Sequence, residues 1–338
     1  MTELWFGLLC FMLIAFVVLD GWNFGAGALH LIVAKTSRER RQVVAALGPA
    51  WSWHEVWLVA AGGVFLLAFP KVMAAAFSGF YLALWLVLWS FIGRGMSIEV
   101  GGHVDDELWQ TGWDVAFAAS SLLLALLFGV ALGNVIRGVP LDQAGRFSMS
   151  LFTDFSVRGR VGILDWYTLS VGIFTAALLT AHGASYLTTT TAGPVHDRSV
   201  WWVRRLWMAV VVLFPVVTLE TWFVRPEMFS AMMRRPVAWL AVAGLATGAG
   251  MVWTGIRRSP GGRTLAGSSA VIAGLLAAAA AAVFPVMLRS TMSGPSLTVH
   301  DGAADAGLRL ALLWWPIAML LAAGYFVVIV RRFGGTTV

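Results

Sequence analysis

The chain has 338 residues, of which 59% are hydrophobic and 12% are charged, and its mean hydropathy is +0.81. A soluble globular domain carries about 25% charged residues, so this composition excludes that class and predicts a polytopic membrane protein. The single cysteine, Cys10, excludes an intrachain disulfide and a Cys-ligated zinc or iron–sulfur centre. The net charge of +6 fits arginine-rich cytoplasmic loops and does not indicate a nucleic-acid partner.

Long apolar runs predict nine membrane-spanning helices, because a helix needs roughly 20 apolar residues to cross the hydrocarbon core. A tight connection near Phe77-Ser78-Gly79 is expected between the second and third spans. An odd number of spans places the two termini on opposite sides of the membrane. The predicted spans are residues 4–33, 53–74, 77–97, 112–136, 164–190, 201–224, 237–256, 265–288 and 308–330.

The loops that follow odd-numbered spans are the more basic ones. The short first loop holds Lys35, Arg38, Arg40 and Arg41, and Arg94 is assigned to the next loop of the same parity. Because cytoplasmic loops carry an excess of Lys and Arg, we expect the N-terminus outside and the C-terminus in the cytoplasm.

An acidic residue interrupts the first span in "FVVLDGWNFGAG". Asp20 lies about 24 Å along this helix, in the inner half of the membrane under the predicted orientation. A carboxylate there costs a few kcal/mol and needs a partner or water. It is either a proton-path residue or a structural hydrogen-bonding group. Gly21 and Gly25 form a small-residue stripe that favours close helix packing, which would supply such a partner.

The stretch "WSWHEVWL" opens the second span with a polar cluster at its inner end. Trp51 suits the interface, and Ser52, His54 and Glu55 are groups that a proton entering from the cytoplasm would meet. An ordinary helix start, with Ser52 as N-cap and an acidic first turn, explains the pattern equally well.

Asp114 begins the fourth predicted span in "GWDVAF", either as a first-turn acid or as a site residue. The solvated loop before it holds four further acids, Glu99, Asp105, Asp106 and Glu107.

The six histidines give little support for a cofactor. No two are spaced i, i+4, and neither HExxH nor CxxCH occurs. We therefore expect this chain to supply no haem ligand and no metal site.

Two pairs of segments echo each other across the halves of the chain. Phe69-Pro70 matches Phe214-Pro215, and "FGVALGNVIRGVPL" (128–141) resembles "FPVMLRSTMSGPSL" (284–297). Either a duplicated bundle or chance in an apolar chain accounts for them.

The chain as a whole resembles subunit II of the cytochrome bd-type quinol oxidases. The resemblance runs nearly end to end. It is carried by "DGWNFGAG" (20–27), "ERRQVVAALGPAWSWHEVWLVAAGGVFLLAFP" (39–70), "AAAFSGFYLALWLVLWSFIGR" (74–94), "GWDVAF" (112–117), "FGVALGNVIRGVP" (128–140), "HGASYL" (182–187) and "FPVMLRSTMSGPSLTVHD" (284–301).

The resemblance implies an all-α polytopic membrane protein of nine helices, arranged as two four-helix bundles plus one peripheral helix. Residues 1–338 would form one integral membrane domain. The first bundle would span 1–140, the second 160–290, and the peripheral helix 305–332.

The resemblance also implies a function. The complex would oxidise quinol and reduce dioxygen to water in the bacterial cytoplasmic membrane. Haems b558, b595 and d would all lie in subunit I, so this chain would bind none and hold no complete active site. It would support assembly and deliver cytoplasmic protons to those haems. The resemblance leaves open a quinone or lipid bound in this subunit, and small single-helix accessory subunits.

The matching proton-route positions are Asp20 and the segment Trp51-Ser52, with His54, Glu55 and Asp114 as further candidates. Some relatives carry an acid where this chain has Ser52, which weakens the case for proton entry at position 52. Glu55, one turn further along the helix, would compensate for the missing carboxylate. Asn23 replaces an acid found in some relatives.

Two other functions fit the same residues. A secondary transporter would use Asp20-Gly21 at a broken first helix as its coupling site. A purely structural partner subunit would leave Asp20 inert.

Overall fold

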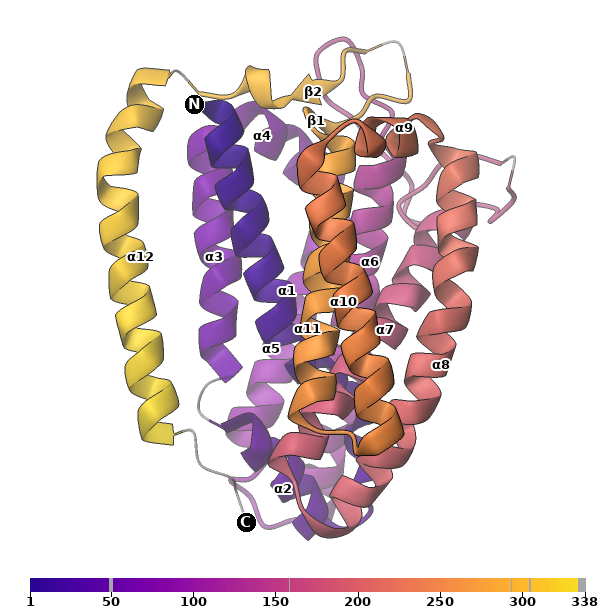
Figure 1. The fold of residues 1–338 in the computed structure, drawn as a ribbon, viewed down its shortest axis with the longest axis vertical. Helices are drawn as coiled ribbons and strands as arrows, with labels where there is room; N and C mark the ends of the chain where they lie inside the picture. The colour runs from indigo at the N-terminus through magenta and orange to yellow at the C-terminus, as the bar shows by residue number, and fades with distance from the viewer. Residues whose placement is uncertain (49–50, 158, 293, 304, 334–338) are drawn as a thin grey trace.

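The computed structural model describes residues 1–48, 51–157, 159–292, 294–303 and 305–333, and within these it describes all side chains except those of 51, 326 and 329–333. The described part is mainly helical, which confirms the predicted class of an all-α polytopic membrane protein (Figure 1). Eight of its helices are long and apolar enough to cross a membrane, or nine if one bent pair counts as a span.

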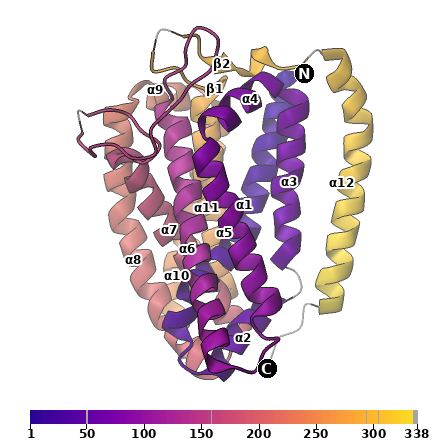
Figure 2. The ribbon, with the colours of Figure 1, turned by 180° about the vertical axis from the view of Figure 1, so that it is seen from behind.

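The helices run up and down beside one another, as the views from both sides show (Figures 1 and 2). The first half of the chain contains α1 (Thr2–Val33), α2 (Ser37–Leu47), α3 (Trp51–Ala68), α4 (Pro70–Gly79), α5 (Tyr81–Val100) and α6 (Glu107–Arg137). The second half contains α7 (Trp166–Thr190), α8 (Gly193–Val224), α9 (Glu227–Met233), α10 (Pro236–Arg258), α11 (Gly262–Val283), β1 (Val286–Leu288), β2 (Leu297–Thr298) and α12 (Asp305–Phe333).

Helix α1 is the central helix of the molecule. It packs against α3 and α6 of its own half and against α7 and α11 of the other. Helices of the two halves therefore pack directly against each other. The division into a first bundle that ends at residue 140 and a second that begins at residue 160 stays a prediction. Helix α12 lies at the periphery beside α3, where Tyr325 stacks on Trp53 with ring centroids 3.9 Å apart.

The second predicted span is shorter than expected. Helix α3 ends at Ala68, and α4 leaves it at an angle of 118°. Pro70 has no N–H to continue the helix and disfavours helical geometry at the residue before it, which explains the break. The chain turns from α4 into α5 at Phe80, directly after the predicted connection near Phe77-Ser78-Gly79.

Other boundaries also differ from prediction. Helix α11 ends at Val283, since Phe284-Pro285 breaks it and the chain continues as β1. Helix α8 begins eight residues before the predicted 201, because the segment around Arg198, which lies between two predicted spans, is helical rather than a loop. Helix α6 begins at Glu107, with Asp106 as its N-cap.

The sequence echoes between the halves do not extend to local structure. Phe69-Pro70 ends a helix, whereas Pro215 lies inside the continuous helix α8. Residues 128–137 are helical in α6, but the matching segment contains β1. These differences argue against reading the echoes as a structural repeat.

Helix α1 passes through Asp20-Gly21 without a break, so the broken first helix that a transporter would use is not present. Its glycines serve packing, as predicted. A Cβ on Gly25 would collide with the backbone of Leu179 and Gly183 on α7, so only glycine permits this approach.

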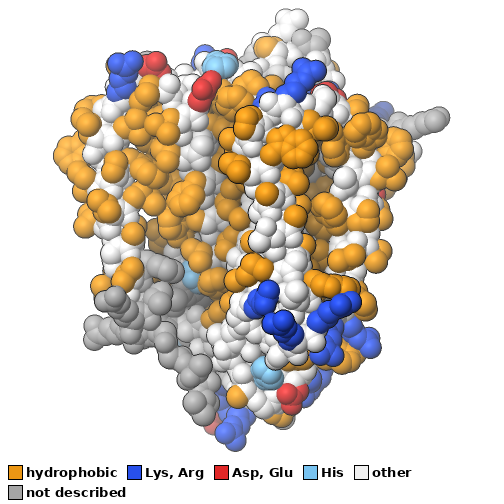
Figure 3. Space-filling view, in the orientation of Figure 1, with side chains coloured by type: hydrophobic (Ala, Val, Ile, Leu, Met, Phe, Trp, Pro, Cys, Tyr) orange, Lys and Arg blue, Asp and Glu red, His pale blue; other side chains and the backbone are white. Residues whose placement is uncertain are grey.

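Charges gather at the two ends of the molecule and leave an apolar band between them (Figure 3). One end holds α2, and the other holds α4, α9 and the β1–β2 pair (Figure 1). This band is the surface expected of a protein embedded in lipid.

Candidate functional site

A buried ion pair joins two helices in the middle of the bundle. Asp20 on α1 and Arg94 on α5 are both fully buried. Arg94 Nη1 lies 3.0 Å from Asp20 Oδ1, and Arg94 Nη2 lies 3.1 Å from Asp20 Oδ2. This two-pronged contact matches the planar guanidinium to the planar carboxylate, and it supplies the partner that an intramembrane acid requires.

Asn23 extends the cluster along α1 and across to α3. Its side-chain amide donates to Asp20 Oδ1 over 2.7 Å and lies 2.8 Å from His54 Nδ1. Asn23 and His54 are both buried. A continuous hydrogen-bonded chain therefore runs from His54 through Asn23 to Asp20.

Glu55 gives the cluster a second carboxylate and its only partly exposed member among the described residues. Its Oε1 accepts a hydrogen bond from Arg94 Nη2, and its side chain is 29% exposed. The expectation of Glu55 as a first-turn acid of α3 is wrong, because it lies beyond the first turn and is paired with Arg94. We call Asp20, Asn23, His54, Glu55 and Arg94 the central cluster.

Aromatic rings surround the guanidinium of Arg94. The faces of Phe24 and Phe91 lie 4.8 and 5.5 Å from it, measured from ring centroid to Cζ. Such rings attract a cation while keeping water away. The assignment of Arg94 to a loop was wrong. It lies inside α5, and a lone arginine in the apolar run "LWLVLWSFIGR" was the signal that could have placed it there.

The other predicted site residues lie outside the central cluster. Ser52 is exposed and lies within the first turn of α3, so it is not the N-cap of that helix. The residue before α3 belongs to 49–50, which lie outside the described residues. The side chain of Trp51 is also outside that description. Asp114 lies seven residues after Glu107, the first residue of α6, so the reading of Asp114 as a first-turn acid is wrong.

Asp114 instead joins a second polar cluster at the α2 end of the molecule. Its Oδ1 lies 2.7 Å from Nε2 of the fully buried His30, and its Oδ2 accepts from Arg40 Nη1 over 2.8 Å. The side chains of Asp114 and Arg40 are 18% and 23% exposed. We call His30, Arg40 and Asp114 the end cluster. Sequence reasoning missed His30 and Arg40, since nothing local links them to position 114.

Helix α2 is fixed beside this cluster by a partly exposed ion pair. Arg198 Nη2 lies 2.6 Å from Glu39 Oε2, and Glu39 also accepts from the backbone N–H of Lys35. The hydrogen bond from Arg198 is the main reason that the pKa of Glu39 is lowered from its usual range.

His182 forms a separate buried contact on α7. Its Nδ1 lies 2.6 Å from Ser268 Oγ on α11, and its Nε2 lies 3.0 Å from the carbonyl of Val18 on α1. Both ring nitrogens are occupied, so this histidine joins three helices. No group of three metal-ligating side chains occurs in the described part of the chain.

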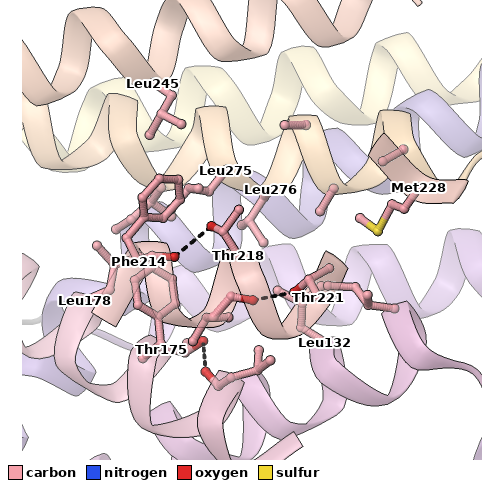
Figure 4. A pocket seen from close by; sticks show the side chains of 18 of the residues that line it. Leu132, Thr175, Leu178, Phe214, Thr218, Thr221, Met228, Leu245, Leu275 and Leu276 are labelled. Carbon is pink, nitrogen blue, oxygen red and sulfur yellow. Dashed lines mark hydrogen bonds between the residues drawn. The ribbon is translucent and has the colours of Figure 1, made fainter. Parts of the chain in front are cut away.

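An apolar cavity of about 440 Å³ is lined by α6, α7, α8, α9, α10 and α11, with Val17 of α1 at its wall. Leucine, valine, phenylalanine and methionine side chains form most of its wall (Figure 4). Three threonine hydroxyls of the wall donate hydrogen bonds to backbone carbonyls of their own helices: those of Thr175, Thr218 and Thr221. The wall thus offers hydrocarbon contact to an occupant and few polar groups.

The fold and the central cluster define a multi-span membrane subunit with a buried ionic network. The chain belongs to the family of cytochrome bd terminal oxidase subunit II, whose model matches residues 1–333. It is therefore a subunit of a bacterial respiratory oxidase of the cell membrane.

Individual relatives agree with this membership. The chain is 28% identical to cytochrome bd-I ubiquinol oxidase subunit 2 of Escherichia coli, over 94% of this chain and 89% of that protein. It is 35% identical to the probable cytochrome oxidase subunit 2 of Haemophilus influenzae, over 58% of this chain. That match spans only 50% of the Haemophilus protein. The bd oxidase structure from Geobacillus thermodenitrificans shares the fold, with a TM-score of 0.77, 18% identity and 98% of each chain covered.

Proposed function

We propose that this chain is a haem-free subunit that carries cytoplasmic protons to the haems of a partner subunit I, where quinol is oxidised and dioxygen is reduced to water. Reduction of dioxygen consumes protons as well as electrons, so a buried haem needs a polar route from water. The alternative of a secondary transporter has lost its structural basis, since α1 is unbroken.

The central cluster is the observation that carries this proposal. A structural subunit has no need of two carboxylates and an arginine inside its hydrocarbon-spanning core, because removing such charges from water is costly. Each member donates or accepts hydrogen bonds, and Glu55 connects the cluster to the surface. The cluster can therefore take up and release a proton within the membrane.

The buried histidines support a subunit without haem. His54 is hydrogen-bonded to Asn23, His30 to Asp114, and His182 to Ser268 and Val18. His182 would have to leave one of its contacts to ligate a haem iron, because both of its ring nitrogens are hydrogen-bonded. Subunit I would then hold haems b558, b595 and d.

The apolar cavity supports a hydrophobic occupant, either the tail of a quinone or the acyl chain of a lipid. Its volume and wall suit hydrocarbon, which gains about 25 cal/mol for each Å² of apolar surface removed from water. Extraction of the purified complex with organic solvent, followed by mass spectrometry, would identify the occupant. A cavity free of both classes would refute this part of the proposal.

The experiment that tests proton delivery is Asp20→Asn. Asparagine is nearly isosteric and still hydrogen-bonds, but it cannot take up a proton near neutral pH. We expect assembly with full haem content, because Glu55 still pairs with Arg94. Quinol-driven oxygen consumption per haem should fall about tenfold, equivalent to ~1.4 kcal/mol on the limiting step.

The matched control is Asp197→Asn, which makes the same chemical change at an exposed position on α8. It should turn over at the wild-type rate. Wild-type turnover in a fully assembled Asp20→Asn complex would end the proton-route proposal and leave a structural role.

A further inference from the structure

One face of α1 carries a line of polar and small residues. Asp20, Asn23, Gly27 and His30 are spaced three, four and three residues apart, so they share one side of the helix. His30 lies about 15 Å along the axis from Asp20, toward α2. This face therefore links the central cluster to the end cluster.

The end cluster meets water at its far side. Asp114 and Arg40 are partly exposed, whereas His30 behind them is fully buried. His30 Nε2 contacts Asp114, and its Nδ1 has no hydrogen-bond partner among the described groups. Nε2 thus faces the partly exposed Asp114, and Nδ1 can form a hydrogen bond with another group.

Ser121 lies between the two clusters. It is fully buried on α6, seven residues beyond Asp114 and therefore on the same face of that helix. Its Oγ also has no hydrogen-bond partner among the described groups. A Cβ on Gly27 would collide with this hydroxyl, so glycine lets α1 approach it closely.

The charged groups around His30 are few. Helix α6 contributes Asp114, which contacts the ring, and α2 contributes Arg40, which is hydrogen-bonded to Asp114. Beyond them, Glu39 of α2 pairs with Arg198 of α8, which also donates to the carbonyl of Val33 on α1. Asp114 is thus the one carboxylate of the described residues that contacts the ring.

We propose that the His30–Asp114 pair is the cytoplasmic entrance of the proton route. This inference rests on the proposed function. Asp114 takes a proton from water and passes it to His30 Nε2. The ring releases its other proton from Nδ1 toward Ser121, and bridging water carries it on to His54 and Asp20, which Asn23 holds in place by its hydrogen bonds. Tautomer exchange then resets the ring, and no proton is gained or lost.

The first test replaces His30 with Gln in the intact oxidase complex. Glutamine preserves a hydrogen bond to Asp114 but cannot relay a proton. We expect full haem content and at least a tenfold loss of quinol-driven turnover, within the range of positioned proton-transfer groups. Asp114→Asn should show a similar loss. His182→Gln is the control, because it changes a histidine that is equally buried but lies off this face.

The second test separates a relay from a structural role. His30→Ala removes the ring and leaves a hole beside the exposed end cluster. Added imidazole should restore its turnover severalfold and in a concentration-dependent way, with no effect on Asp20→Asn. A pH dye should also report slower proton uptake at the cytoplasmic face in a single turnover of His30→Gln.

The outcomes distinguish the two proposals. Normal turnover in His30→Gln, with Asp20→Asn still slow, would overturn the entrance and leave the central cluster as the route. Normal turnover in Asp20→Asn would overturn the proposed function itself. A slow His30→Ala variant that imidazole fails to restore would also overturn the relay.

Discussion

At the scale of single residues, Arg94 determines whether the central cluster can exist. A buried ion pair is a poor source of stability, but removal of one partner leaves an uncompensated charge. Arg94 neutralises Asp20 and contacts Glu55 at the same time, so its loss would leave two carboxylates without their cation.

Replacement of Arg94 by Met should therefore destabilise the subunit by roughly 3–5 kcal/mol. We expect less assembled complex and a lower midpoint in thermal unfolding of the detergent-purified protein. Arg205→Met removes a cation stacked on Trp201 and should leave the midpoint almost unchanged. Equal midpoints for the two variants would show that the Arg94 pair contributes nothing to folding.

At the scale of elements, α1 presents different chemistry on different faces. Gly21 and Gly25 bring it against α7, whereas Asp20, Asn23 and His30 face contacts on α3, α5 and α6. The close α1–α7 contact fixes the position of the polar face, so packing on one side sets hydrogen-bond geometry on the other.

Gly25→Ala tests this coupling. The added methyl would meet the backbone of Leu179 and Gly183, which cannot move aside as a flexible side chain would. Overpacking of this kind costs about 1–3 kcal/mol, and we expect a lower thermal midpoint together with reduced turnover. Gly7→Ala is the control in the same helix, because nothing lies within 4 Å of its Cβ position. A midpoint no lower in Gly25→Ala than in Gly7→Ala would contradict the coupling.

At the scale of the whole molecule, the orientation in the membrane decides which end supplies protons. The end that holds α2 carries Lys35, Arg38 and Arg41, and the opposite end carries β1 and β2, between which Met292 lies in the sequence (Figure 1). The positive-inside rule predicts that the α2 end is cytoplasmic.

Cysteine labelling tests that orientation in a Cys10→Ala background. Ser37 and Met292 are both exposed and lie at opposite ends. A membrane-impermeant maleimide should label Met292→Cys in intact cells and Ser37→Cys only after permeabilisation. The reverse pattern would place the end cluster outside and exclude it as a cytoplasmic entrance.

The sequence predicted the elements far better than the contacts between them. Hydrophobic run length places each span because it depends on neighbouring residues, and misses such as Ala68 and Val283 occur where a proline overrides that signal. Asp20 was recognisable alone as a charge in an apolar helix. Its partner Arg94 is 74 positions away, as Asp114 is 84 from His30, and no local pattern encodes either pairing.

The composition of the central cluster has an electrostatic consequence. With Asp20 and Glu55 ionised and Arg94 positive, the three side chains carry a net charge of −1. One added proton brings that sum to zero, and a second would make it positive inside a medium of low permittivity. On the proposed proton route, this charge balance favours one added proton in the cluster over two. Protons would then cross this subunit one at a time, each leaving before the next arrives.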